Sequence, residues 1–150
     1  TELLLLDEPS SGLDAVARQS ILAVVVRSVA EEGRTVVFSS HLLDEVERVA
    51  DRVAMIHEGR VTLDMPMEDI KASHHKYVVR WRDRQTAIPD LPGVIHALGE
   101  GCEWGMICHG DRTAFEAAVR QTQGEIVEAA TPTLEAVFVA RASGRVAAGV

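Results

Sequence analysis

Two adjacent carboxylates directly follow an apolar run near the start of the chain. The stretch TELLLLDEPSSGLD places Asp7 and Glu8 after Leu3–Leu6, and Asp14 comes soon after a Pro-Ser-Ser-Gly turn. Adjacent residues of a strand point to opposite sides, so the two carboxylates are expected to have different roles. In nucleotide hydrolysis, one carboxylate can hold hydrated Mg²⁺ and the other can deprotonate the attacking water. The alternative is that both acids only close a strand before a turn.

A histidine follows the next apolar run. His41 comes directly after RTVVFSS, which spans residues 34–40. The carboxyl ends of neighbouring parallel strands meet at one edge of a sheet, where open α/β folds bind ligands. His41 is therefore expected near Asp7 and Glu8, where its ring could donate a hydrogen bond to a γ-phosphate. Taken alone, it could equally be a histidine at a helix start or in a loop.

The elements that must position these residues alternate between strand and helix. The continuous apolar runs at residues 3–6 and 34–40 are typical of strands buried on both faces. A helix is expected between them, a short helix over residues 42–50, and a hairpin with its turn at Glu58-Gly59. This order predicts an α/β fold with a mostly parallel sheet, one edge of which the hairpin finishes.

The helix between the two strands has clear end signals. Asp14 is suited to the N-cap of a helix that begins at Ala15, and Gly33 is suited to its C-terminal cap. The apolar side chains expected to share one face of this helix are Ile21, Val24, Val25 and Val29.

The composition changes around residues 73–75, which divides the chain into predicted domains at residues 1–73 and 74–150. In the second domain, strands are expected at residues 76–81, 102–109 and 125–130, and an amphipathic helix at residues 112–123. Thr131 and Pro132 suit the N-cap and first position of a final helix. This region is predicted to be a small α+β domain.

Charge and composition exclude several classes of function. The net charge is −8 and no basic stripe is present, so binding to nucleic acid is not expected. The longest strongly apolar stretch, residues 21–26, is far shorter than the roughly 20 residues that span a bilayer. Cys102 and Cys108 are expected to be reduced thiols. The spacings of His74, His75 and His109 match no structural zinc pattern, and these histidines are expected at the surface and in loops.

The first 65 residues resemble a known family without gaps. LLLLDEP is similar to the Walker B motif of ABC transporter ATPase domains, SGLD to their D-loop, and VVFSSHLLDEVERVADRVAMIHEGRV to the segment with the switch histidine and closing hairpin. The resemblance implies that Asp7 coordinates Mg²⁺ through water, that Glu8 is the general base, and that His41 contacts the γ-phosphate of ATP. It implies a dimer interface, where two ATPase subunits bind ATP between them, at Ser11, Gly12 and Asp14.

The end of the chain is similar to a second feature of the family. TPTLEAVFVARASG resembles the end of the extension found on the ATPase subunits of many bacterial exporters. The resemblance implies the carboxyl-terminal part of a P-loop NTPase sheet followed by a small α+β domain. It also implies an ATP-hydrolysing subunit that acts with a transmembrane permease and a second ATPase subunit, on the cytoplasmic face of the cell membrane.

Two motifs of the family have no counterpart in these residues. The phosphate loop needs a Gly-Lys-Ser or Gly-Lys-Thr step, but the two lysines are followed by Ala72 and Tyr77, and the chain contains no Gly-Gly pair for the signature loop. We therefore expect that these 150 residues alone neither bind ATP tightly nor hydrolyse it. The alternatives are an ABC ATPase without a transport role, such as a DNA-repair or ribosome-associated member, and a truncated, non-catalytic interaction or regulatory module.

Overall fold

The computed structural model describes residues 3–143 and 147–148, and the chain divides into two compact units between Ala50 and Asp51. The two units are described separately below. The predicted domain boundary between Ser73 and His74 coincides with a junction of elements, because helix α3 ends at Ser73 and strand β5 begins at His74. That boundary stays a prediction. Gly144, the last residue of the second motif, lies outside the described residues.

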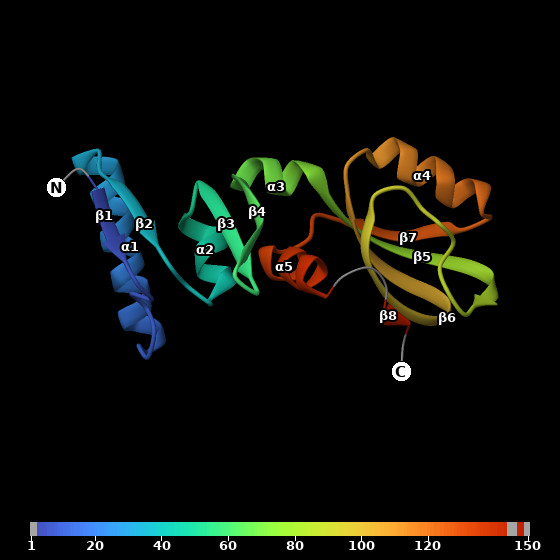
Figure 1. The fold of residues 1–150 in the computed structure, drawn as a ribbon, viewed down its shortest axis with the longest axis horizontal. Coiled ribbons are helices and arrows are strands. Elements are labelled where there is room, and N and C mark those ends of the chain that lie inside the picture. Colours follow the sequence, from blue (N-terminus) through green and yellow to red (C-terminus); the bar gives the residue numbers. More distant parts are fainter. Residues whose placement is uncertain (1–2, 144–146, 149–150) are drawn as a thin grey trace. The chain divides into compact units, whose positions relative to one another are not determined.

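The first unit alternates between strand and helix (Figure 1). Its elements are β1 (Leu3–Leu6), α1 (Ala15–Glu32), β2 (Thr35–Phe38) and α2 (Leu43–Val49). Strands β1 and β2 pair in parallel, with Leu6 opposite Phe38. The α/β order and the parallel pairing were both predicted from the sequence, and the pairing brings the carboxyl ends of the two strands to the same edge.

Helix α1 begins and ends where the sequence predicts. The Asp14 carboxylate accepts hydrogen bonds from the backbone N–H groups of Val16 and Ala17, both at 2.9 Å. Gly33 closes the helix with φ of 60°, a left-handed conformation that glycine adopts without a steric penalty. The predicted buried face is wrong in part, because Val24 and Val29 are exposed. Val25 is buried as predicted, and Leu22 and Ser28 are buried beside it.

The two strands of the first unit are not buried on both faces, as the apolar runs predict. Their side chains alternate between half-buried and exposed, and Leu5 is 68% exposed and Val37 55% exposed. Helix α1 contacts β2, while the outward-facing leucines and valines remain in contact with solvent. A two-stranded sheet with a single covering helix can bury only one side of each strand.

The second unit begins with a hairpin and a short helix. Strands β3 (Arg52–His57) and β4 (Arg60–Pro66) pair antiparallel around the predicted Glu58-Gly59 turn, and α3 (Met67–Ser73) follows. The turn residues have φ of 49° and 73°. These two strands form a sheet of their own. The prediction that the hairpin finishes an edge of the parallel sheet is therefore wrong for the chain as it folds here.

A four-stranded sheet with the order β7-β5-β6-β8 forms most of the second unit. Its strands are β5 (His74–Gln85), β6 (Val94–His109), β7 (Glu125–Ala130) and β8 (Ala147–Ala148). Strand β5 pairs antiparallel with both β6 and β7. The predicted strands are present, and β6 begins several residues earlier than the sequence predicts. The thiols of Cys102 and Cys108 are free, the first exposed and the second buried.

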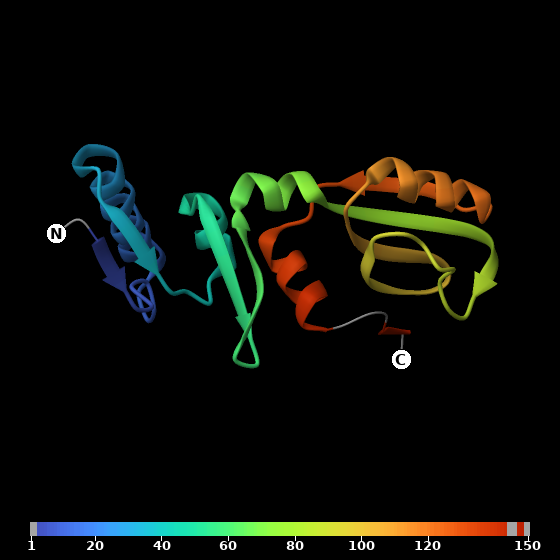
Figure 2. The same ribbon diagram turned by 45° about the horizontal axis from the view of Figure 1, so that its top comes forward.

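Helix α4 (Arg112–Gln121) covers one face of this sheet (Figure 2). The rings of Phe115 on α4 and Tyr77 on β5 are stacked, with centroids 4.4 Å apart. Trp81 and Trp104 belong to the same buried cluster. The second unit therefore has an extensive apolar core.

The final helix, α5 (Leu134–Ala142), begins later than predicted. Its N-cap is Thr133, whose hydroxyl accepts a hydrogen bond from the backbone N–H of Ala136 at 3.2 Å. The prediction of Thr131 as the cap is wrong, because the first helical residue is Leu134 and the N-cap is the residue directly before it, Thr133. The prediction for the adjacent histidines is also wrong: His74 is fully buried and His75 is 8% exposed.

Candidate active site

Asp7, Glu8 and His41 meet at the carboxyl edge of the parallel pair. The backbone N–H of Ser39 donates to the carbonyl oxygen of Leu6 at 2.9 Å, which extends the pairing of β1 and β2 by one step. The residues that follow both strands therefore leave the sheet together. The sequence predicts this arrangement, because strand ends in a parallel pair share one edge.

Ser39 joins the carboxylate of Asp7 to the backbone of Glu8, a contact that sequence reasoning missed. Its hydroxyl donates to Oδ1 of Asp7 and accepts a hydrogen bond from the backbone N–H of Glu8 at 2.9 Å. The carboxylate of Asp7 and the backbone of Glu8 are thus held by one side chain from the neighbouring strand end. The sequence feature that could have indicated this contact is a residue with a hydroxyl group, Ser39, directly after the second apolar run.

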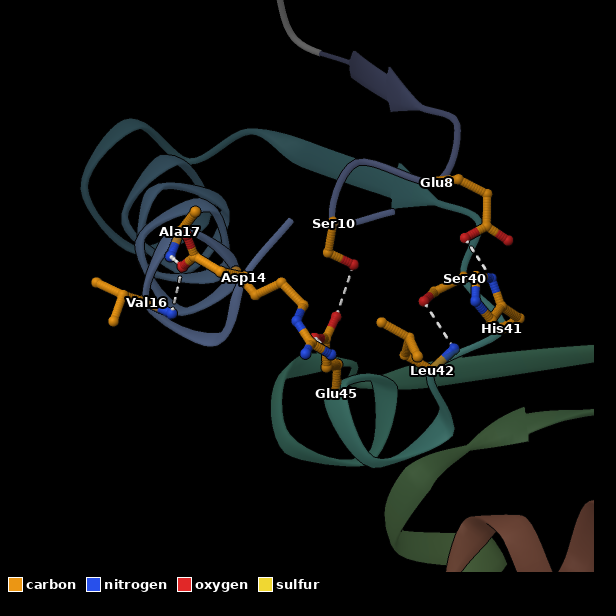
Figure 3. Close-up of polar contacts among 10 residues, drawn as sticks. Glu8, Ser10, Asp14, Val16, Ala17, Ser40, His41, Leu42 and Glu45 are labelled. Atoms are coloured by element: carbon orange, nitrogen blue, oxygen red, sulfur yellow. Dashed lines mark hydrogen bonds and ion pairs between the residues drawn. The ribbon is translucent and has the colours of Figure 1, made fainter. Parts of the chain in front are cut away.

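The side chains of Glu8 and His41 are in direct contact (Figure 3). Nδ1 of His41 lies 2.8 Å from Oε2 of Glu8. The ring nitrogen donates in this pair when Glu8 is ionised, because a carboxylate has only acceptors. The exposed fractions of the two side chains are 66% for His41 and 36% for Glu8. Both groups are therefore open to a ligand at this edge.

The backbone of Glu8 adopts an unusual conformation. Its φ is 45°, in the left-handed region that non-glycine residues rarely adopt. Such a conformation costs about 1–2 kcal/mol and needs support from its surroundings. Here the support comes from the bond of the Glu8 N–H to Ser39 and from the bond of the Ser11 N–H to the Glu8 carbonyl oxygen at 3.0 Å. Strained residues of this kind concentrate at functional sites.

The turn after Glu8 is anchored by a buried polar pair that the sequence did not reveal. The hydroxyl of Ser10, which is 2% exposed, donates to Oε2 of Glu45 on α2 at 2.7 Å. The other oxygen of Glu45 lies 3.6 Å from Nη1 of Arg18 on α1. Glu45 therefore joins the turn to both helices of the first unit, as Figure 3 shows for the pair with Ser10.

The rest of the turn presents the three remaining candidate residues. Ser11, Gly12 and Asp14 are all exposed. Gly12 has φ of 73°, and the space where a side chain would begin is open. Oδ1 of Asp14 accepts both cap bonds from α1. Side-chain contacts thus connect His41 directly with Glu8, and Ser39 connects Asp7 with the Glu8 backbone. The side chains of Ser11 and Asp14 make no described contact with these three residues.

Replacement of Asp14 should destabilise the first unit without changing its fold. We expect Asp14→Ala to lower the free energy of unfolding by about 1 kcal/mol, because two N–H groups of α1 lose their acceptor. Asp14→Asn keeps an acceptor at the same position and should cost much less. Urea denaturation of both variants, followed by circular dichroism at the helix band, makes the comparison. Equal losses in the two variants would contradict the cap role.

The chemistry of the site fits a magnesium–nucleotide complex. Mg²⁺ in nucleotide sites is held by one or two carboxylates together with phosphate oxygens and water. Asp7 offers an exposed carboxylate at the ligand edge, fixed through one oxygen by Ser39. Within residues 3–143 and 147–148, no group of three or more histidine, cysteine or acidic side chains is arranged to hold a metal ion.

Comparisons with known proteins found relatives that match most or part of the chain. No protein-family model matches the chain. It is 26% identical over 151 residues to the ABC transporter ATP-binding protein YtrB of Bacillus subtilis, a match that covers 95% of the chain and 49% of the relative. It is 34% identical over 140 residues to a fluoroquinolones export ATP-binding protein of Mycobacterium tuberculosis, covering 92% of the chain and 42% of the relative.

A third relative matches a shorter part. The bacitracin transport ATP-binding protein BcrA of Bacillus licheniformis is 36% identical over 77 residues, which are 51% of the chain and 25% of that protein. The chain spans about half the length, or less, of the curated relatives that it matches. The two longer matches cover more than nine-tenths of the chain and therefore run through both of its units.

These likenesses indicate one class of protein. The chain is similar to ATP-binding proteins of bacterial transporters, among them an ABC transporter ATP-binding protein and a fluoroquinolones export ATP-binding protein. It matches the carboxyl-terminal portion of these proteins. No helix in the part of the chain that the structure describes has the length and apolar character needed to cross a membrane.

Proposed function

We propose that the chain is the carboxyl-terminal part of the ATP-hydrolysing subunit of an export-type ABC transporter. The observation that carries this proposal is the contact of Glu8 with His41, 2.8 Å apart, at the ends of two adjacent parallel strands. Support also comes from the relatives, whose names describe ATP-binding proteins that export fluoroquinolones or transport bacitracin. We favour transport over the two alternatives for that reason.

Glu8 is the proposed general base. One of its carboxylate oxygens contacts His41, and among the described residues the other has no hydrogen-bond partner. That free oxygen can accept a proton from a water molecule that attacks the γ-phosphate of ATP. The left-handed backbone of Glu8 and its bonds to Ser39 and Ser11 fix the direction of the side chain. Fixed orientation of this kind gives general-base catalysis its effect.

His41 is the proposed contact to the γ-phosphate. Its Nδ1 is engaged with Glu8, which leaves Nε2 for a second partner. A ring that carries both protons would donate to Glu8 through Nδ1 and to a phosphate oxygen through Nε2. Loss of the phosphate after hydrolysis would then remove one of the two partners of His41, so the ring can report the state of the nucleotide.

Asp7 is the proposed ligand of Mg²⁺, through a water molecule. When bound, the metal ion neutralises charge on the β- and γ-phosphates of ATP. Asp7 contributes a carboxylate whose position is set by the Ser39 hydroxyl. Because Ser39 also holds the backbone of Glu8, the metal ligand and the base share one support.

The exposed turn at Ser11, Gly12 and Asp14 is the proposed contact to a second ATPase subunit. Its side chains lie at the surface, and its backbone is fixed from below by Ser10 and by the cap of α1. A rigid, exposed turn loses little conformational entropy when it docks. We propose that the assembled subunits act on the cytoplasmic face of the membrane, bound to a transmembrane permease.

The full P-loop sheet is also proposed, with residues 1–73 as its carboxyl-terminal part and residues 74–150 as an accessory domain. The open faces of β1 and β2, with Leu5 and Val37 exposed, are surfaces that further strands and helices of such a sheet would cover. We propose that the phosphate loop and signature loop are supplied by residues outside these 150. The chain alone would then neither bind ATP tightly nor hydrolyse it.

Replacement of His41 in the complete subunit tests this function. With the permease present, we expect His41→Ala to lower the rate of ATP hydrolysis about a hundredfold or more, as removal of a hydrogen-bond donor from a developing charge does. His57→Ala is the matched control, since His57 lies on β3 in the second unit and packs edge-on against Phe138. It should leave the rate within about twofold of the unchanged protein. Equal rates for the His41 variant and the unchanged protein would refute the assigned role.

A further inference from the structure

The second unit contains a cavity that the proposed ATPase function does not use. Its volume is about 410 Å³, within the range of sites for small molecules. It is lined by polar and apolar groups of strand β4, of strand β6 and the residue before it, and of helix α5. The lining residues are Thr62, Gly93, Val94, Ile95, His109, Ala140 and Arg141.

Arg141 brings a positive charge to the wall of this cavity. Its Nη1 donates to the carbonyl oxygen of Thr62 at 3.3 Å, and its Nη2 lies 2.9 Å from Nε2 of His74. Neither partner carries a negative charge. Burial lowers the pKa of Arg141, and no carboxylate among the described residues offsets that cost. The guanidinium is therefore a partly buried cation without a counter-ion in the described part of the chain.

His74, which contacts Arg141, is a neutral ring and cannot neutralise the positive charge of the guanidinium. His74 is fully buried, and its Nδ1 lies 2.9 Å from the carbonyl oxygen of Ile70. A carbonyl oxygen only accepts, so Nδ1 carries the proton and Nε2 of the neutral ring is an acceptor. Nε2 therefore accepts a hydrogen bond from Arg141 and orients the guanidinium. The geometry uses two of the five N–H groups of Arg141, at Nη1 and Nη2.

We propose that this cavity binds a small anion that carries a carboxylate or phosphate group, with Arg141 as its counter-charge. Guanidinium groups bind carboxylate and phosphate groups well, because they can donate two parallel hydrogen bonds to two oxygens of either group. A partly buried cation without a counter-ion costs free energy, and an anion in the cavity would lower that cost. The remaining N–H groups of Nη1 and Nη2 are the donors expected to contact it.

Two further residues shape the site. The His109 ring packs against that of His74, with centroids 4.7 Å apart, and burial and Arg141 lower its pKa. His109 can thus offer a neutral hydrogen-bonding group to the ligand. Gly93 has φ of 77°, and a side chain there would lie 2.6 Å from the carbonyl oxygen of His109. The backbone approach that forms this wall of the cavity therefore requires glycine.

Titration of the full 150-residue chain with inorganic phosphate, and separately with acetate, tests the proposal. The readout is the NMR signal of the His109 imidazole and of the Arg141 side-chain nitrogens, near neutral pH. We expect a saturable change with at least one of the two anions, which chloride at matched ionic strength does not reproduce. A response to phosphate alone would assign a phosphate-bearing ligand, and a response to acetate alone would assign a carboxylate.

Three variants separate binding from folding. Arg141→Gln removes the charge, and Ile95→Trp fills the cavity while leaving Arg141 in place; each should weaken binding about tenfold or more. Arg80→Gln is the control, because the guanidinium of Arg80 is already paired with Glu103 at 2.7 Å, and its binding should be unchanged. The absence of a saturable change in the unchanged chain, or equal affinity in Arg141→Gln or in Ile95→Trp with intact folded spectra, would overturn the proposal.

Discussion

Glu8→Gln in the complete subunit is expected to suppress ATP hydrolysis while leaving ATP binding intact. We expect the rate to fall about 10²- to 10⁴-fold, the range that a positioned general base contributes. Glutamine keeps the size of the side chain and can still contact His41, but its amide cannot accept the proton of the attacking water. A loss of turnover with unchanged affinity identifies a group that acts in the transition state.

The control for this substitution is Glu31→Gln. Glu31 is exposed near the end of α1 and undergoes the same chemical change. Its rate should match that of the unchanged subunit within about twofold, because surface substitutions away from a site have small effects. A fall in ATP affinity that accounts for the whole loss in Glu8→Gln would mean that Glu8 serves binding and not proton transfer.

Acid should destabilise the second unit through His74. Burial is the main cause that lowers the pKa of His74 from 6.5 to about 4, and Arg141, His109 and His75 add to the effect through their charges. The unfolded state therefore binds a proton at a higher pH than the folded state does. This contribution to stability is complete above pH 6.5 and is lost progressively as the pH falls from 6.5 towards 4.

The expected size of this loss is about 3 kcal/mol in the free energy of unfolding. Protonation of Nε2 would end its bond with Arg141 and set two positive charges side by side. Urea denaturation across this pH range measures the loss, with the fluorescence of Trp81 and Trp104 as the probe, since both belong to the core of the second unit. His74→Gln does not titrate and should show a smaller pH dependence.

His75 and His109 remain in that variant, and burial lowers the pKa of each, so a residual dependence of the same sign is expected. His57→Gln serves as the matched control and should keep the full dependence of the unchanged chain. If unfolding of His74→Gln varied with pH as steeply as that of the unchanged chain, the buried His74 would not be the cause.

Features that depend on neighbours in the sequence were predicted well. The Asp14 cap, the Gly33 end of α1 and the Glu58-Gly59 turn each follow from local backbone chemistry. The meeting of Glu8 with His41 was also within reach, because the pairing of consecutive parallel strands brings their ends together. The order of the strands therefore predicted the proximity of Glu8 and His41, which neither residue's local sequence reveals.

Features that depend on distant partners could not be predicted. Ser10 and Glu45 are 35 positions apart, and neither has a neighbour in the sequence that marks it as buried. The burial of His74 depends on the carbonyl oxygen of Ile70 and on Arg141, which is 67 positions away. A polar residue is buried only where such partners satisfy it, and the sequence does not reveal where they meet.

The central claim is that Glu8 takes the proton from the water that attacks ATP, and a single-turnover experiment tests it most directly. Radiolabelled ATP is bound to an excess of the complete subunit, and the conversion of bound ATP to ADP is followed over time. We expect the unchanged subunit and Glu31→Gln to convert their bound ATP at the same rate, while Glu8→Gln holds it intact about 10² to 10⁴ times longer. Conversion at equal rates in Glu8→Gln and the unchanged subunit would contradict the claim.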